Sequence, residues 1–407
     1  MAQRAFEVIV IGAGAAGLAA AAELAHADRS VLVLEARERI GGRAWTRRMP
    51  GLDVPVELGA EFIHGGSEAT YALLKSARIG SVASTRTQRY LSGGRLRPIN
   101  AFAQAQKAMR DAAILRDSDM AFADYLARTR VPAVTRTFAR LMVQGFDAAD
   151  PRLASAREIV AEWAEVSASQ PRPLGGYGPL VEFLAREAKV QLQTVVREVR
   201  WKHSSVELRG SFRGEPWSAR APRAIIALPL GVLQSRLVRF TPRLRKPLDK
   251  LESGPVVRVA MAFRNAFWEK EHPGNAFFYS PDAPFPTFWT PLPMHAPLLT
   301  AWAGGPKAAG LTGSSEKKLL AQALASVRSV LGSIEEPSAF AIHDWQADPY
   351  ARGGYSYVRV GGTGARQELA APLEETLYFA GEATDLEQSG TVGGALASGL
   401  RAAKEIR

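Results

Sequence analysis

The chain has 407 residues, enough for two lobes with a hydrophobic core each, and its 47% hydrophobic and 22% charged residues are typical of a soluble globular protein. A net charge of +11 is spread along the chain rather than gathered in one run, so we interpret it mainly as a solvated basic surface. The absence of cysteine excludes disulfides, cysteine nucleophiles and cysteine-linked cofactors, and because the histidines show no pair at metal-ligand spacing we predict no metal site.

The longest apolar run, residues 8–22, is shorter than a membrane span. Its fifteen residues fall short of the ~20 that cross a bilayer. The run lies where a signal peptide would, but it contains a nucleotide-binding fingerprint, so we interpret it as folded structure. We therefore expect no membrane span and a cytoplasmic protein. We expect no nucleic-acid partner, because the basic residues lack an interleaved aromatic stripe or a recognition-helix motif.

The first predicted elements are a buried strand, a glycine-rich turn and a helix. Residues 8–11 are four apolar residues in a row, which indicates a strand of parallel-sheet type. Gly12, Gly14 and Gly17 then have the G-x-G-x-x-G spacing. In this pattern the first glycine permits a tight turn, the second lets the backbone approach a pyrophosphate, and the third lets helix and strand pack closely. The phosphates would meet the positive N-terminus of the helix.

An acid and an arginine follow at useful distances. A second apolar strand, residues 31–34, ends at Glu35, about where a ribose 2′-hydroxyl would be bound. This predicts an adenine dinucleotide without a 2′-phosphate, either FAD or NAD. Arg43 comes after two glycines, the second of which is Gly42, and is well placed to neutralise pyrophosphate charge.

A second glycine-rich turn and a helical region come next. Gly59 and Gly65 bracket an apolar turn that carries Glu61 and His64, and such backbone beside a nucleotide-binding unit suggests close approach to the cofactor. From residue 67 to residue 150 the pattern indicates a helical insertion rather than more sheet. We predict helices around residues 68–78, 100–115, 118–129 and 133–145.

The rest of the chain mixes strands with fewer helices. The strand at residues 256–263 is apolar except for Arg258, and the aromatic segment 277–302 is typical of a pocket wall and sheet core. Nucleotide-like signals occur at both ends of the chain, so we expect domains woven from discontinuous segments. We predict strands at residues 190–199, 205–212, 224–228, 256–263 and 339–345, and helices at 180–188, at 315–331 and from 390.

Four motifs carry a family resemblance: residues 35–43 (EARERIGGR), 58–65 (LGAEFIHG), 345–357 (WQADPYARGGYSY) and 378–384 (YFAGEAT). Together they resemble the flavin-containing amine oxidases, a group that includes polyamine oxidases, monoamine oxidases, L-amino-acid oxidases and histone demethylases. The resemblance runs from end to end and implies FAD in an extended site under a substrate lobe. Because the absence of cysteine excludes the cysteinyl flavin of the monoamine oxidase branch, we expect FAD to be held noncovalently.

The resemblance also implies which residues hold the cofactor. Arg37 would join Glu35 and Arg43 around the adenosine ribose and phosphates, and Val196 would meet adenine through its backbone. Thr391 and Val392 would offer N–H groups to the flavin pyrimidine, at a helix N-terminus whose dipole stabilises reduced flavin. The expected cofactor-binding residues are Gly12, Gly14, Gly17, Glu35, Arg37, Gly42, Arg43, Gly59, Ala60, Glu61, Val196, Trp345, Gly381, Glu382, Thr391 and Val392.

Three residues are the expected catalytic group: His64, Arg258 and Tyr355. The resemblance implies that His64 lies near the substrate and that Tyr355 and Trp345 wall the flavin or the substrate nitrogen. The alternative is a satisfied turn residue for His64 and core packing for Tyr355 and Trp345. Arg258 stands where most of the family has a lysine that anchors a water near flavin N5. Since a charge in so apolar a strand is costly unless paired, we expect Arg258 to face flavin, an acid or an ordered water.

We therefore predict an α/β flavoenzyme with a Rossmann-type FAD-binding domain (residues 1–80, 175–258 and 353–407) and a mixed α+β substrate lobe (81–174 and 259–352). The expected reaction is hydride transfer from a small-molecule amine to flavin N5, giving an imine that hydrolyses, with O2 reoxidising the flavin to yield hydrogen peroxide. Two alternatives remain open. One is an FAD-dependent desaturase or dehydrogenase with another acceptor, and the other is an FAD-stabilised binding protein without turnover.

Overall fold

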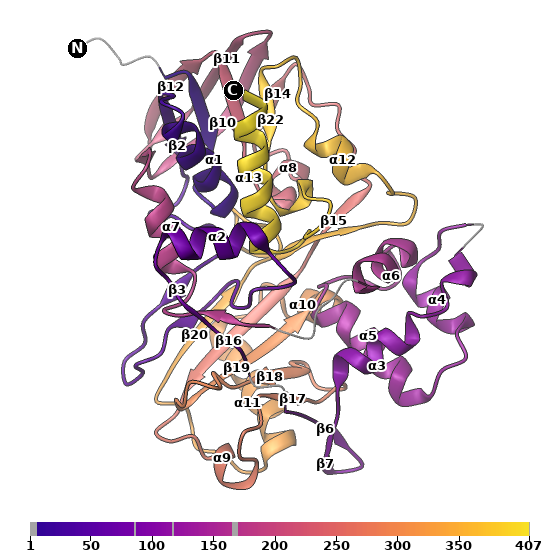
Figure 1. The fold of residues 1–407 in the computed structure, drawn as a ribbon. Helices are drawn as coiled ribbons and strands as arrows, with labels where there is room; N and C mark the ends of the chain where they lie inside the picture. The colour runs from indigo at the N-terminus through magenta and orange to yellow at the C-terminus, as the bar shows by residue number, and fades with distance from the viewer. Residues whose placement is uncertain (1–5, 85–86, 116–117, 165–169, 407) are drawn as a thin grey trace.

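The computed structural model describes residues 6–84, 87–115, 118–164 and 170–406 (Figure 1). Its first layer is a five-stranded sheet in the order β22-β13-β1-β2-β9, and all four strand pairs are parallel. The central strands β1 and β2 are buried along their whole length, so they appear in the sequence as continuous apolar runs. The strands are β22 (Leu377–Phe379), β13 (Arg223–Ile226), β1 (Val8–Ile11), β2 (Val31–Leu34) and β9 (Lys189–Gln191).

Helices cover one face of the parallel sheet and a second sheet covers the other. α1 (Ala15–His26), α7 (Gly178–Ala185) and α13 (Val392–Ile406) pack on the face that carries Val8 and Val10. The opposite face, with Ile9 and Ile11, meets a four-stranded sheet in the order β12-β11-β10-β14. That sheet is built from β10 (Thr194–Lys202), β11 (Ser205–Phe212), β12 (Glu215–Ala221) and β14 (Arg239–Thr241).

The other half of the molecule is organised by a seven-stranded sheet in the order β20-β16-β19-β18-β17-β6-β7. It is antiparallel except where β17 runs parallel to β6. α10 (Gly305–Leu311) and α11 (Glu316–Leu331) pack on one face. The strands are β6 (Gln88–Ser92), β7 (Arg95–Pro98), β16 (Val256–Ala262), β17 (Phe277–Tyr279), β18 (Thr287–Trp289), β19 (Leu298–Gly304) and β20 (Ala339–Asp344).

A group of helices lies at the side of this sheet (Figure 1). It shares a buried core with the aromatic strand residues Phe277, Tyr279 and Trp289. The helices are α3 (Ala101–Ala108), η1 (Ala112–Leu115), α4 (Phe122–Arg128), α5 (Ala133–Gly145) and α6 (Ala156–Ala164).

Short elements connect these layers. They are α2 (Glu68–Ser76), α8 (Leu230–Gln234), α9 (Trp268–Glu271), α12 (Ala365–Ala370) and η2 (Glu382–Thr384), with the strand pairs β3 (Thr46–Arg47) and β4 (Val56–Glu57), β5 (Ser81–Val82) and β8 (Arg172–Pro173), and β15 (Leu251–Gly254) and β21 (Tyr355–Val358).

The α/β class agrees with the sequence-based prediction, but the expected helical insertion is wrong in part. Inside that region β5, β6 and β7 are strands, which a helical insertion without further sheet does not include; they form because β5 pairs with β8 and β6 pairs with β17, both far along the chain. The proposed division into two domains stays a prediction. Its boundary after residue 258 falls inside β16, and its ranges include residues outside those described.

Candidate functional site

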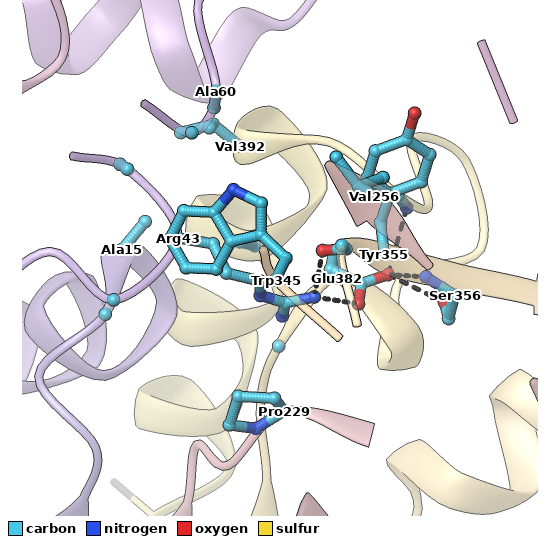
Figure 2. A pocket seen from close by; sticks show the side chains of 18 of the residues that line it. Ala15, Arg43, Ala60, Pro229, Val256, Trp345, Tyr355, Ser356, Glu382 and Val392 are labelled. Carbon is cyan, nitrogen blue, oxygen red and sulfur yellow. Dashed lines mark hydrogen bonds and ion pairs between the residues drawn. The ribbon is translucent and has the colours of Figure 1, made fainter. Parts of the chain in front are cut away.

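A cavity of about 480 Å³ lies at the carboxyl ends of β1, β2 and β13 and continues toward the seven-stranded sheet. Figure 2 shows part of its lining, with side chains contributed by segments from both ends of the sequence. All the predicted cofactor-binding and catalytic residues line it except Gly17. The predicted set is therefore brought together around one space.

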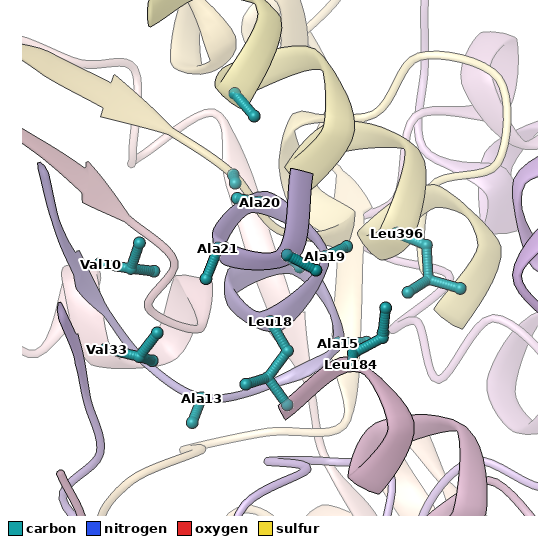
Figure 3. Close-up of a cluster of buried hydrophobic side chains, with 14 of the residues drawn as sticks. Val10, Ala13, Ala15, Leu18, Ala19, Ala20, Ala21, Val33, Leu184 and Leu396 are labelled. Carbon is teal, nitrogen blue, oxygen red and sulfur yellow. The ribbon is translucent and has the colours of Figure 1, made fainter. Parts of the chain in front are cut away.

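Of the three glycines in the turn, Gly14 has open space beside it, whereas Gly12 and Gly17 are packed tightly against other backbone atoms. A Cβ placed on Gly14 would meet nothing within 4 Å, so this backbone borders open space. A Cβ on Gly12 would come within 2.7 Å of the Ala227 carbonyl oxygen, and one on Gly17 within 1.9 Å of the Gly12 carbonyl oxygen. Gly17 is thus a packing position in the first turn of α1, and Figure 3 shows the alanine-rich core around this helix.

The N-terminus of α1 suits an anionic ligand. Gly14 caps the helix without a side-chain hydrogen bond, and no acidic residue stands in the first turn. The positive end of the helix dipole and the N–H groups of the first turn can therefore bind an anionic ligand in the cavity. This donor set, together with the open position at Gly14, fits the pyrophosphate of a dinucleotide.

Glu35 ends β2 at the cavity wall and is held in place by backbone donors. Its Oε2 accepts a hydrogen bond from Ala13 N at 2.9 Å and its Oε1 one from Arg37 N at 2.9 Å. The Arg37 guanidinium turns to Asp348, 2.8 Å away, which with His343 holds the pKa of that carboxyl well below its usual range in spite of burial. Glu35 thus has the fixed orientation that a ribose-binding acid needs.

Arg43 and Glu382 form the central ion pair of the cavity floor (Figure 2). Arg43 Nη1 donates to Glu382 Oε1 at 2.9 Å and to the Gly354 carbonyl at 2.7 Å. Glu382 Oε2 accepts from Ser356 Oγ at 2.6 Å and from Gly390 N at 3.2 Å. Burial alone would raise the pKa of Glu382, but Arg43 and the Ser356 hydrogen bond hold it below its ordinary value.

Arg366 is a buried part of this network that the sequence-based prediction missed. Its Nη1 donates to Ser356 Oγ at 2.6 Å, and the same hydroxyl donates onward to Glu382. The side chain sits on α12 without a motif, so its position becomes evident only once the chain is folded.

Arg258 is paired with an acid, which was one of the three partners expected for it. It is 1% exposed, its Nη2 donates to Glu61 Oε2, and its Nη1 donates to the Gly59 carbonyl at 2.7 Å. Glu61 also accepts from Arg172 Nε at 2.7 Å and from Trp289 Nε1 at 2.9 Å. Burial raises the pKa of Glu61, but the two arginines outweigh it and lower the pKa overall. Arg172 was not predicted.

His64, Tyr355 and Trp345 take different places in the wall. Burial lowers the pKa of His64 to about 4, so its imidazole is neutral near pH 7, and it packs edge-on against Phe146. The Tyr355 hydroxyl donates to the Phe146 carbonyl at 2.7 Å, and burial raises its pKa well above the ordinary value. Trp345 donates through Nε1 to the Leu58 carbonyl at 2.9 Å. Tyr355 is therefore a wall residue rather than a proton donor to a ligand.

Two further acids reach the cavity from the helical side. Asp147 follows α5 and accepts from Trp163 Nε1 at 2.9 Å, and Glu162 lies on α6. Burial raises the pKa of both carboxyl groups, and Glu162 raises that of Asp147 further. Aromatic rings surround this end of the cavity: Phe62, Phe102, Phe146, Phe277, Tyr279, Trp289 and Trp302.

Among the residues that the structure describes, no cluster of three or more histidine, aspartate or glutamate side chains is placed to hold a metal ion. No helix in the same ranges combines the length and apolar character needed to cross a bilayer.

The fold and cavity place the chain among α/β proteins with a large ligand site at the carboxyl ends of a parallel sheet. A family model described as flavin-containing amine oxidoreductase matches residues 15–407. The chain belongs to this family, as its motifs predicted, and the family implies a flavin cofactor.

Curated relatives of the chain include polyamine oxidases and lysine-specific histone demethylases. Polyamine oxidase 4 of Oryza sativa subsp. japonica is 28% identical over 437 residues, covering 98% of this chain and 88% of that protein. Lysine-specific histone demethylase 2 of Homo sapiens is 26% identical over 446 residues, and there this chain spans only about half of the relative's length, 53%.

Solved structures resemble the whole chain. A redesigned variant of putrescine oxidase has a TM-score of 0.83 at 24% identity, covering 98% of both chains. Cyclohexylamine oxidase from Brevibacterium oxydans has a TM-score of 0.83 at 23% identity, covering 99% of this chain and 98% of that one. At this identity the likeness establishes the fold.

Proposed function

We propose that the protein binds FAD noncovalently in this cavity and oxidises a small-molecule amine. The observation that carries the proposal is the continuity of the cavity, which joins the open backbone at Gly14 to an aromatic chamber bordered by Asp147. When bound, FAD supplies the acceptor for a hydride from the carbon next to the amine nitrogen, giving an imine that hydrolyses, and O2 is the proposed final acceptor, yielding hydrogen peroxide.

Each end of the cavity has its own task. At the parallel sheet, Glu35 would bind the ribose, and Arg43 with the N-terminus of α1 would balance the phosphates. At the other end, the aromatic rings exclude water and enclose the apolar part of the substrate. A substrate that enters as an ammonium ion would favour the ionised forms of Asp147 and Glu162, whose pKa values burial raises in the empty cavity, and His64, which stays neutral, would not repel it.

The known relatives favour amines as substrates. The neighbours include a putrescine oxidase bound to putrescine and a cyclohexylamine oxidase, so one accepts a diamine and the other is named for a cyclic monoamine. For this chain we propose only that the substrate contains an amine group.

Anaerobic mixing tests the proposal directly. The purified protein should show the absorbance of oxidised flavin, and released flavin should be FAD after the protein is denatured. Primary, secondary and polyamine substrates should be screened for bleaching of that absorbance, followed by a peroxide assay in air. If no amine in the panel bleaches the flavin, the proposed reaction is wrong.

The paired Arg258 favours one alternative, oxidation with an acceptor other than O2. Its guanidinium is committed to Glu61 and the Gly59 carbonyl, whereas the family lysine is expected to hold a water. Turnover with O2 should be compared with turnover with a quinone or a dye, in the wild type and in Arg258→Lys. Equal oxygen reactivity in both proteins would remove the reason for this alternative.

A further inference from the structure

We propose that Arg172 is a positioning residue for the cofactor cavity: through Glu61 it holds Arg258 as a fixed positive charge, and the net charge of the three raises the reduction potential of the bound flavin. The inference rests on the proposed function, because it requires a flavin in the cavity. It concerns a residue without a sequence motif, on the short strand β8.

Arg172 has an acceptor for each of its three side-chain nitrogens. Nε donates to Glu61 Oε1 at 2.7 Å, Nη1 to the Leu292 carbonyl at 2.7 Å, and Nη2 to the Thr290 carbonyl at 3.0 Å. Its guanidinium also lies 4.4 Å from the ring centre of Phe62, and its side chain is 4% exposed. The Arg172 side chain is therefore anchored to the segment after β18 and holds a fixed position beside Glu61.

Glu61 links the fixed Arg172 side chain to Arg258, because its carboxylate binds both guanidinium groups. One carboxylate oxygen receives Arg172, and the other receives Arg258 together with Trp289 Nε1 at 2.9 Å. With both oxygens occupied, the carboxylate has one orientation. Arg258 in turn is held by Glu61 and by the Gly59 carbonyl, and its guanidinium carbon lies 5.1 Å from the ring centre of Trp289.

The three charges do not cancel. Two guanidinium groups and one carboxylate leave a net charge of +1, enclosed where water screens little. Glu61 and Arg258 both line the cavity, and Arg258 binds the backbone next to Ala60, which lines it too. Since two-electron reduction adds negative charge to a flavin, a fixed positive charge beside it favours the reduced form. Arg258 Nε is buried and has no hydrogen-bond partner among the described residues, so the pairing of this side chain runs through its two terminal nitrogens.

Two substitutions change the charge in opposite directions, and both disturb the hydrogen bond between Arg172 and Glu61. Arg172→Gln leaves a net charge of 0, so the flavin potential should fall. Glu61→Gln leaves a net charge of +2, so the potential should rise. We expect each shift to change the ratio of reduced to oxidised flavin at least tenfold, which is about 30 mV for a two-electron couple. The measurement is spectrophotometric titration of the FAD-loaded protein against a dye of known potential.

Two controls separate charge from packing. Arg172→Lys keeps the charge and should keep the wild-type potential. Arg359→Gln also removes one positive charge, but from a pair with Glu252 outside the cavity lining, and should leave the potential unchanged.

The outcomes distinguish this inference from the proposed function. If Arg172→Gln and Glu61→Gln shift the potential in the same direction, or not at all, while amines still bleach the flavin, the three residues are only structural and the inference is wrong. Should Arg172→Gln fail to fold, Glu61→Gln decides alone, since an unchanged or lower potential contradicts the proposal. A wild-type protein that takes up no FAD would overturn the proposed function and this inference with it.

Discussion

Position 258 places an arginine in a strand whose other six residues are apolar. The alternation of β16 turns Val257, Val259 and Met261 toward α11, and Arg258 to the opposite face, where Glu61 meets it. A buried charge needs such a partner, so the sequence could predict that one exists. It could not tell which acid it is, because Glu61 lies 197 residues before Arg258 in the chain. The second arginine that binds Glu61, Arg172, is equally hard to foresee, since it lies 111 residues after that acid.

A first prediction at this scale concerns Asp147. Asp147→Asn removes the carboxyl group that a substrate ammonium ion would ionise and pair with, so a charge-assisted hydrogen bond between substrate and protein is lost. The value of kcat/KM for amines should fall roughly tenfold, mainly through KM, while the flavin spectrum stays unchanged. Steady-state kinetics of the two proteins check this. A fall confined to kcat would show that Asp147 acts in another way.

A second prediction concerns His64 and pH. Its pKa of about 4 in the folded protein lies below the ordinary 6.5, so the unfolded chain binds a proton first as the pH falls. Stability should therefore be lost as pH falls from about 6.5 toward 4, by about 3 kcal/mol from this residue alone.

His64→Asn should flatten that part of the curve. Urea unfolding at several pH values and a constant FAD concentration measures the slope, and the same substitution at exposed His203 controls for the loss of a histidine as such. An unchanged slope in His64→Asn would contradict the assignment.

At the scale of elements, the sequence was most informative where a strand or helix is specified locally. The strands at 8–11 and 31–34 have the predicted limits, because runs of buried apolar residues fill both faces. β6 and β7 were missed, since their residues are polar or half-exposed and alternate weakly; these strands form because β17 offers an edge to pair with. β12 was missed for a related reason, as the edge of a mostly exposed hairpin.

The glycine turn gives a matched pair of variants. Gly17→Ala drives a Cβ to 1.9 Å from the Gly12 carbonyl oxygen and should prevent α1 from packing on β1, with loss of soluble folded protein. Gly14→Ala adds a methyl group where nothing lies within 4 Å.

Gly14→Ala should therefore keep its fold yet weaken FAD binding at least tenfold, because the methyl group occupies the approach to the pyrophosphate. Circular dichroism and FAD titration of the apoprotein separate the two effects. Equal FAD affinity in Gly14→Ala and the wild type would mean that the phosphates lie elsewhere.

At the scale of the whole molecule, cofactor and fold should stabilise each other. FAD bound between β1, β2 and η2 should raise the unfolding free energy by about 2.7 kcal/mol when free FAD is a hundred times its Kd. Glu382→Gln leaves Arg43 without its charged partner and should shrink this gain. Thermal unfolding with increasing FAD checks both statements; a melting temperature independent of FAD in the wild type would contradict them.

The meeting of the two ends of the chain has a consequence for biosynthesis. The parallel sheet needs β22 beside β13, and α1 lies so close to α13 that a Cβ on Gly399 would be 2.2 Å from the Ala16 carbonyl oxygen. Residues 377–406 leave the ribosome long after residues 8–34. Until then the N-terminal unit lacks its edge strand and a covering helix, and Arg43 lacks Glu382. We therefore expect a growing chain to retain the cofactor only after residues 377–406 have been made, and premature termination before them should leave apoprotein in which the alanine-rich face of α1 is exposed.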